Sequence, residues 1–142
     1  MLKDIALLQS IKKGAQMGSQ GIEEIMPHTK KEPFRKALET QKEEYKEIEQ
    51  EAERLLTKRK TEPEDLSSMA KMSSKTMTFM KTFQDDSEEH LAEMMYQGSA
   101  MGVTKIIRNL REYGGSDSEV RALAQRLLKT EENNMEQMKK FL

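Results

Sequence analysis

The sequence predicts an all-α protein, a bundle of long helices that forms one domain over residues 1–142. Apolar residues recur at steps of three and four in successive segments, which is the spacing of one helix face. Several segments begin with Ser or Thr followed three residues later by Glu, a helix-start signal. Charged residues make up 35% of the chain and aromatic residues 5%, a composition typical of long helices with solvated outer faces. We predict helices over 2–26, 30–58, 62–83, 87–113 and 117–142.

The first two segments are expected to form a helical hairpin over residues 2–58. Pro27 ends the first helix, and the capping box Thr29 to Glu32 begins the second. A connection this short makes the two helices antiparallel neighbours. The expected core positions are Leu8, Ile11, Ala15, Gly18, Ile22 and Ile25, then Phe34, Leu38, Gln41, Tyr45, Ile48, Ala52 and Leu55.

The segment 62–83 is expected to be a crossover helix. The capping box Thr61 to Glu64 precedes it, and Leu66, Met69, Met77 and Met80 give it a soft apolar face. With 12 methionines in the chain, we expect a methionine-rich core, because this flexible side chain fills irregular space.

The last two segments are expected to form a second hairpin, over residues 87–142. Asp86 and Ser116 are the expected starts, and Gly114-Gly115 suits a left-handed helix end. The expected core positions are Leu91, Met95, Gly98, Gly102, Ile106, Leu110 and Tyr113, then Val120, Ala124, Leu127, Glu131, Met135, Met138 and Leu142.

A five-residue pattern, Gly-x-x-Met-Gly, occurs at 14–18 and again at 98–102. The repeat suggests that the two hairpins are copies. Each glycine inside a helix costs about 1 kcal/mol relative to alanine, whereas glycines four apart allow two helices to approach closely. We therefore expect Gly14, Gly18, Gly98 and Gly102 to face one another. A bend in the first helix and space for a ligand are the alternatives.

Charge and cysteine content narrow the classes of function. Lys and Arg number 24 against 25 Asp and Glu, a net charge of −1, so the chain has no overall positive field for nucleic acid or an anionic membrane. The chain has no cysteine and no unbroken apolar run near its start. A cytoplasmic protein without a nucleic-acid or membrane partner is the expectation.

Two stretches, His90-Leu-Ala-Glu-Met-Met-Tyr-Gln-Gly-Ser-Ala-Met-Gly102 and Thr130-Glu-Glu-Asn-Asn-Met-Glu-Gln-Met-Lys-Lys-Phe-Leu142, resemble bacterial ferritin-like helical-bundle proteins of unknown function. The resemblance covers essentially the whole chain. It implies a ferritin-like four-helix bundle made of two hairpins with an additional crossover helix, five helices in up-down order. In families with an intact site it also implies a di-metal carboxylate centre.

The residues do not reproduce that centre. Such sites use Glu-x-x-His on two helices, and neither His28 nor His90 has Glu three positions earlier. Glu24 and Glu131, with neighbouring carboxylates, are the candidate ligands for an oxygen-rich metal site, and we expect no cofactor. Glu131, Gln41 and Tyr45 fall on apolar faces, so a small hydrogen-bonded polar cluster inside the bundle is expected.

The expected function follows from these observations. No nucleophile motif or phosphate-binding loop is present, so we expect a non-enzymatic helix-bundle protein. It would act through contacts with a protein partner or with itself as a homodimer. One alternative is a ferritin-like iron or manganese binding protein with a carboxylate-rich site, and a second is a coat or scaffold component.

Overall fold

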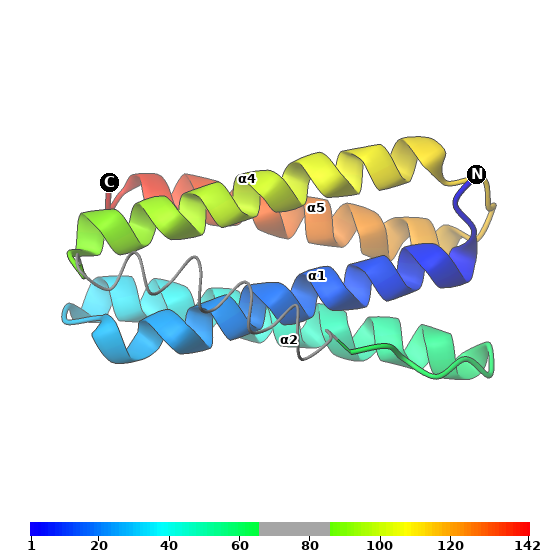
Figure 1. Cartoon of the computed structure of the whole chain (residues 1–142), viewed down its shortest axis with the longest axis horizontal. Helices are drawn as coiled ribbons and strands as arrows, with labels where there is room; N and C mark the ends of the chain where they lie inside the picture. The colour runs from blue at the N-terminus through cyan, green and yellow to red at the C-terminus, as the bar shows by residue number, and fades with distance from the viewer. Residues whose placement is uncertain (66–85) are drawn as a thin grey trace.

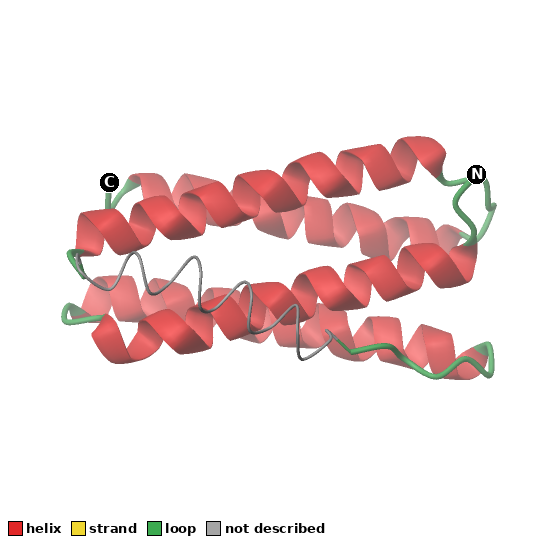
Figure 2. Cartoon of the chain, viewed as in Figure 1, coloured by secondary structure: helices red, strands yellow, loops and turns green. Residues whose placement is uncertain are grey.

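The structure is a computed structural model that describes residues 1–65 and 86–142, and this part of the chain is a helical bundle without extended strands. Figure 2 shows that almost all of it is helical. The helices are α1 (Asp4–Ile25), α2 (Glu32–Lys58), α4 (Glu88–Glu112) and α5 (Ser118–Lys139), and a short 3-10 turn, η1 (Met26–His28), follows α1. The four helices predicted outside the segment 62–83 therefore exist, and each of their ends lies within three residues of the predicted position.

The two predicted hairpins are present as neighbours. In Figure 1, α1 and α2 form one antiparallel layer and α4 and α5 the other. α1 runs antiparallel to α4, while α2 and α4 run in the same direction. The predicted crossover helix 62–83 lies outside the described residues from position 66 onward. Its first residues, 62–65, are not helical.

The core lies where the apolar periodicity predicts it. All seven expected positions on α2 are buried, including the polar Gln41. On α4 the prediction is less accurate, because Gly98 is exposed and Gly102 is half-buried. Among the methionines of the described residues, only Met95 and Met138 are buried, while Met1, Met17 and Met101 are exposed. Aliphatic side chains therefore dominate this part of the core.

The helix starts differ in detail from the capping boxes. α5 is capped by Asp117, whose carboxylate accepts hydrogen bonds from the backbone N–H groups of Glu119 (2.9 Å) and Val120 (3.3 Å). α4 is capped by Ser87 rather than Asp86. Thr29 does not cap α2, because the helix begins only at Glu32 with Lys31 at the cap position; the Thr29 hydroxyl donates instead to the Met26 carbonyl at 2.7 Å. Both caps that form lie one residue after the predicted position.

The chain start is held against the turn between α4 and α5. The Leu2 N–H donates to the Glu112 carbonyl at 2.7 Å, and the Gly114 N–H donates to the Leu2 carbonyl at 2.8 Å. Gly114 and Gly115 have no positive φ, so the expected left-handed helix end is wrong. A Cβ at Gly114 would overlap Met1. The Met1 side chain is 97% exposed and can move away, so this overlap shows that the N-terminal residues pass close to the turn and does not require glycine.

Residues 61–65 lie along α1 and are held by its side chains. The Gln9 amide donates to the Glu62 carbonyl at 3.0 Å and accepts from the Glu64 N–H at 2.8 Å. The Lys12 side chain is 2% exposed. Its ammonium group donates to the Glu64 carbonyl at 2.9 Å and to the Asp65 carboxylate at 2.5 Å. The capping box predicted at Thr61 does not form, because these contacts hold the backbone in a non-helical path.

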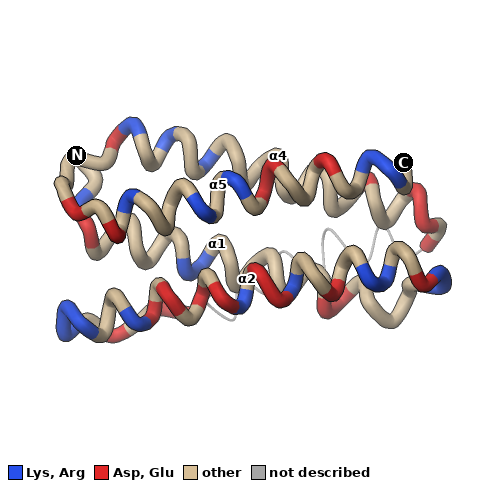
Figure 3. Tube along the Cα trace, turned by 180° about the vertical axis from the view of Figure 1, so that it is seen from behind, with Lys and Arg blue, Asp and Glu red and all other residues tan. Residues whose placement is uncertain are grey.

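Charged residues of both signs are interspersed along the helices, as Figure 3 shows most clearly along α2. Several form ion pairs between helices, such as Arg126 of α5 with Glu44 (2.7 Å) and Glu47 (2.9 Å) of α2. None of the helices in the described ranges has a stretch that is long and apolar enough to cross a membrane.

Candidate functional site

A buried cluster of hydrogen-bonded polar side chains occupies the centre of the bundle. The Tyr45 hydroxyl of α2 donates to the Glu131 carboxylate of α5. The Ser99 hydroxyl of α4 lies 3.5 Å from the same carboxylate oxygen, and the Asn134 amide donates to the Tyr45 oxygen at 3.0 Å. All four residues are less than a tenth exposed. Three helices therefore meet at one closed polar cluster.

The cluster was predicted in part from the sequence. The apolar periodicity placed Glu131, Tyr45 and Gln41 on inward faces, and all three are buried. Gln41 contacts a different residue, since its amide donates to Gln137 of α5 at 2.9 Å. Sequence reasoning missed Ser99 and Asn134. Asn134 follows Glu131 by three residues, a spacing that places both on one face of α5, and this signal was available.

Two glycines of the repeated motif make room for the cluster. A Cβ at Gly18 would lie 2.5 Å from the Tyr45 ring, and a Cβ at Gly102 would overlap a carboxylate oxygen of Glu131. The second glycine of each motif therefore lies against one member of the Tyr45–Glu131 pair. Since α1 packs on α2 and α4 packs on α5, the two hairpins use the motif in the same way.

The contact expected between the four motif glycines is replaced by these glycine–side-chain contacts. A Cβ at Gly14 would meet Leu127 at 3.5 Å, an ordinary packing distance, and one at Gly98 would have no neighbour within 4 Å. The physical reason is that large side chains, Tyr45 and Glu131, fill the space that close helix approach would have removed. Of the four motif glycines, Gly18 and Gly102 are the two at which a Cβ would overlap a neighbouring side chain.

The cluster is electrostatically unusual because, among the residues that the structure describes, its buried carboxyl group is bonded to neutral hydroxyl groups and not to a cation. Burial raises the pKa of Glu131 from 4.5 to about 7, although hydrogen bonds from Tyr45 and Ser99 act in the opposite direction. Burial, together with the neighbouring Glu131 charge, also raises the pKa of Tyr45. Glu131 therefore changes its charge near neutral pH, whereas Tyr45 stays protonated and donates to it.

The two candidate metal ligands occupy separate helices and are not part of one acidic cluster. Glu131 lies in the cluster on α5, and Glu24 is half-buried near the last turn of α1. Within the described ranges, no three His, Asp or Glu side chains are grouped as a metal site would require. One Glu131 oxygen accepts from Tyr45 and Ser99, and the other lies against Gly102.

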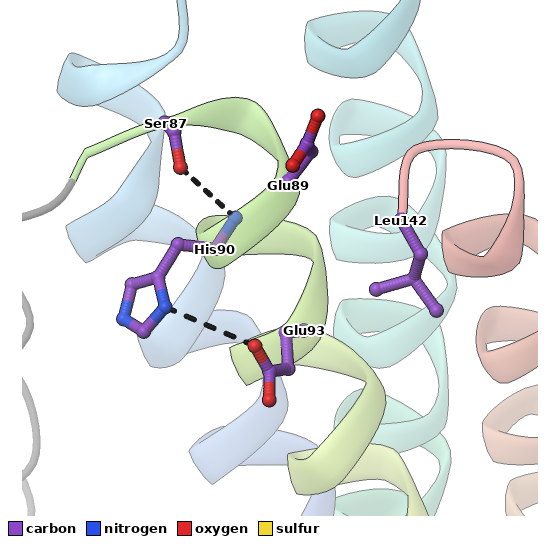
Figure 4. Close-up of a pocket in the computed structure, with 5 residues that line it drawn as sticks. All are labelled: Ser87, Glu89, His90, Glu93 and Leu142. Atoms are coloured by element: carbon purple, nitrogen blue, oxygen red, sulfur yellow. Dashed lines mark hydrogen bonds and ion pairs between the residues drawn. The ribbon is translucent and has the colours of Figure 1, made fainter.

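A surface hollow lies beside the cluster, between α2 and α5. It includes Gln41 and Asn134, so it reaches the residue that bonds Tyr45. A second hollow, of about 330 Å³, lies away from the cluster at the start of α4 and is drawn in Figure 4. In that view the His90 ring projects to the opposite side of the helix from Leu142. Its Nδ1 lies 3.9 Å from the Glu93 carboxylate.

Comparison with known proteins adds no relative to this description. No protein-family model matches the chain, and neither the curated proteins nor the solved structures give a match.

Proposed function

We propose that this chain is a non-enzymatic, ferritin-like helix-bundle protein that acts through protein contacts, with a second copy of itself as the partner. The observation that carries the proposal is the exposure of the methionine in both Gly-x-x-Met-Gly motifs. Met17 is 51% exposed and Met101 is 74% exposed. Exposed apolar side chains that gather in one patch are a feature of contact surfaces, and methionine adapts to varied partners.

The two methionines lie at the same height on neighbouring helices. Ser10 of α1 and Asn109 of α4 are hydrogen-bonded at 2.8 Å. Met17 lies seven residues after Ser10 on α1, and Met101 lies eight residues before Asn109 on α4. Because the two helices are antiparallel, both methionines lie in the same direction from this hydrogen bond, about 10 and 12 Å along the bundle. Met17 is also two helical turns from Ser10 and so lies on the α4 side of α1. We call Met17 and Met101 the methionine pair.

A homodimer suits this surface because α1 and α4 are antiparallel and carry the same motif. A two-fold interface joins the same patch of each copy, so each methionine pair would meet the other. The net charge of −1 gives two copies little mutual repulsion. The ferritin-like part of the proposal is supported by the two antiparallel hairpins and by the parallel direction of α2 and α4.

Sedimentation velocity over a concentration series tests the proposal. We expect a reversible dimer of the wild-type chain. The double variant Met17→Ser/Met101→Ser should weaken it at least about tenfold, because it removes four apolar side chains from the dimer interface. Leu142→Ser is the control. It changes an apolar side chain that is 56% exposed and lies away from the methionine pair, so it should leave the dimer affinity unchanged. A monomer at every concentration, or an equal loss in the control, would contradict the proposal, and large assemblies would favour a scaffold component.

The metal-binding alternative is tested on the same preparation. The Glu131 carboxylate is occupied by Tyr45 and Ser99, which supports a structural rather than a ligating carboxylate. Metal analysis of protein purified without chelators or a histidine tag decides between the two. Near-stoichiometric iron or manganese that is lost in Glu131→Ala would replace the proposed function with metal binding.

A further inference from the structure

The outer face of α4 carries a continuous stripe of exposed residues. Residues three or four apart share one face of a helix, and seven such positions follow one another along α4, all of them exposed. We call these residues the α4 stripe. They are Glu89, Glu93, Gln97, Met101, Thr104, Arg108 and Arg111. Met101 lies in the middle, so the α4 stripe runs through the surface that carries the methionine pair.

The charges of the α4 stripe are separated by sign, unlike the interspersed charges of α2. The first half carries only acidic residues, Glu89 and Glu93, and the second half only basic ones, Arg108 and Arg111. Residues 94–104 between them contain no charged residue. The outer face of α4 is therefore acidic at one end, uncharged in the middle and basic at the other end.

The protein's own side chains leave these charges largely unpaired. Within the described ranges 1–65 and 86–142, neither Arg108 nor Arg111 forms an ion pair, and Glu89 forms none either. Glu93 has only the His90 Nδ1 atom at 3.9 Å and a 3.4 Å hydrogen bond from the next residue of the α4 stripe. Exposed charges of this kind can pair with a partner, and complementary charges set the orientation of a contact.

Two copies of the α4 stripe complement each other when the helices are antiparallel. Glu93 and Arg108 are centred between positions 100 and 101. Glu89 and Arg111 are centred on position 100, beside Met101. A two-fold axis at this centre reverses the second helix, so each acidic residue faces the arginine at the same distance from the centre in the other copy. In a parallel pair, the two acidic halves would face each other, and so would the two basic halves.

We propose that α4 docks on the antiparallel α4 of a second copy. Glu93 of each copy pairs with Arg108 of the other, nearest to the centre. Glu89 pairs with Arg111 at the rim of the contact. The proposal rests on the dimer of the proposed function and adds its orientation. The methionine pair supplies apolar contact, which has no direction, whereas the charges of the α4 stripe select one orientation and register.

Charge reversal in the α4 stripe tests this pairing by sedimentation velocity. Arg108→Glu/Arg111→Glu makes the stripe acidic throughout, and Glu89→Arg/Glu93→Arg makes it basic throughout. Each variant alone should dimerise at least about tenfold more weakly than the wild-type chain, because like charges then face each other. An equimolar mixture of the two variants should dimerise again, to within about threefold of the wild-type affinity. Recovery in the mixture also shows that both variants are folded.

A matched control separates this pairing from a general effect of charge. Lys36→Glu/Lys129→Glu changes the net charge by the same amount at exposed positions of α2 and α5 and should leave the dimer affinity unchanged. An equal loss in this control, or no recovery in the mixture, would overturn the pairing. A dimer that is lost in Met17→Ser/Met101→Ser but unaffected by charge reversal would overturn the pairing and leave the proposed function intact. A wild-type monomer at every concentration would overturn both.

Disulfide cross-linking tests the orientation, and the chain has no cysteine that would interfere. Gln97 and Thr104 are also centred between positions 100 and 101, so Gln97 of one copy lies opposite Thr104 of the other. A mixture of Gln97→Cys and Thr104→Cys should cross-link at least about fivefold faster than either variant alone. Identical positions lie about 10 Å apart along antiparallel helices, which is beyond the reach of a disulfide. Faster cross-linking of either variant with itself would show another orientation and overturn the proposal.

Discussion

Gly102 of α4 lies directly against the carboxylate of Glu131 on α5, so closely that a single methyl group at Gly102 would overlap the Glu131 oxygen. The glycine is the reason why a glutamate can occupy the centre of the bundle. The other hairpin repeats the arrangement, with Gly18 of α1 against the ring of Tyr45 on α2. Because Tyr45 and Glu131 are hydrogen-bonded to each other, the two glycines together shape the space for one polar pair.

Alanine at the two glycines of the second motif should therefore have opposite effects. Gly102→Ala should lower the free energy of unfolding by about 1 to 3 kcal/mol, because Glu131 has to move out of its hydrogen bonds. A Cβ at Gly98 has no neighbouring atom within 4 Å, so Gly98→Ala should raise the free energy of unfolding by up to about 1 kcal/mol through helix propensity. Urea denaturation measures both. A stabilising effect of both variants would show that Gly102 does not constrain Glu131.

The stability of the protein should fall as pH rises toward neutrality. The pKa of Glu131 is about 7 in the folded chain against an ordinary value of 4.5, so the folded state holds this proton more tightly than the unfolded state. Raising the pH from below 4.5 to above 7 should cost at most about 3 kcal/mol of unfolding free energy. Denaturation midpoints across this pH range measure the change.

Glu131→Gln is the control for that pH dependence. The amide keeps the shape of the side chain and does not titrate, so the decrease between pH 4.5 and 7 should disappear. If the variant shows the same decrease as the wild-type chain, another group is responsible for it.

Tyr45→Phe should destabilise the bundle and shift the titration of Glu131. The variant removes a hydroxyl that donates to Glu131 and accepts from Asn134, at a cost of about 1 to 3 kcal/mol. Since the Tyr45 hydrogen bond lowers the pKa of Glu131, its loss should raise that pKa further, and NMR of the Glu131 carboxyl carbon measures it. Tyr113→Phe makes the same change at a hydroxyl bonded to Asp4 and should leave the Glu131 pKa unchanged.

Periodicity predicted the helices and most of the core because burial of an apolar face decides both. It also placed Tyr45 and Glu131 inside, because a polar residue at a core spacing stands out from its neighbours. The partners of the glycines could not be predicted in this way. A glycine at a core position fits a close backbone contact and a large opposing side chain equally well, and only the packing of α4 on α5 decides that Glu131 faces Gly102.

The start of the connection after α2 shows a second limit of sequence reasoning. Thr61 and Glu64 have the spacing of a capping box, and Pro63 suits a first helical turn, yet residues 61–65 are not helical. Tertiary contacts override the local preference for a helix here, because Gln9 and Lys12 donate hydrogen bonds to the backbone carbonyls of residues 62 and 64. Nothing in residues 61–65 themselves identifies these partners.

The contact between Gln9 and residues 62–64 should therefore protect a specific amide. The Glu64 N–H donates to the Gln9 side chain at 2.8 Å, and a hydrogen-bonded amide exchanges with solvent only when the contact opens. Gln9→Ala should speed hydrogen exchange at Glu64 by at least about tenfold while amides in the middle of α1 and α2 keep their rates. Gln50→Ala, at an exposed position of α2, should change neither. Unchanged exchange at Glu64 in Gln9→Ala would mean that this contact does not hold the segment against α1.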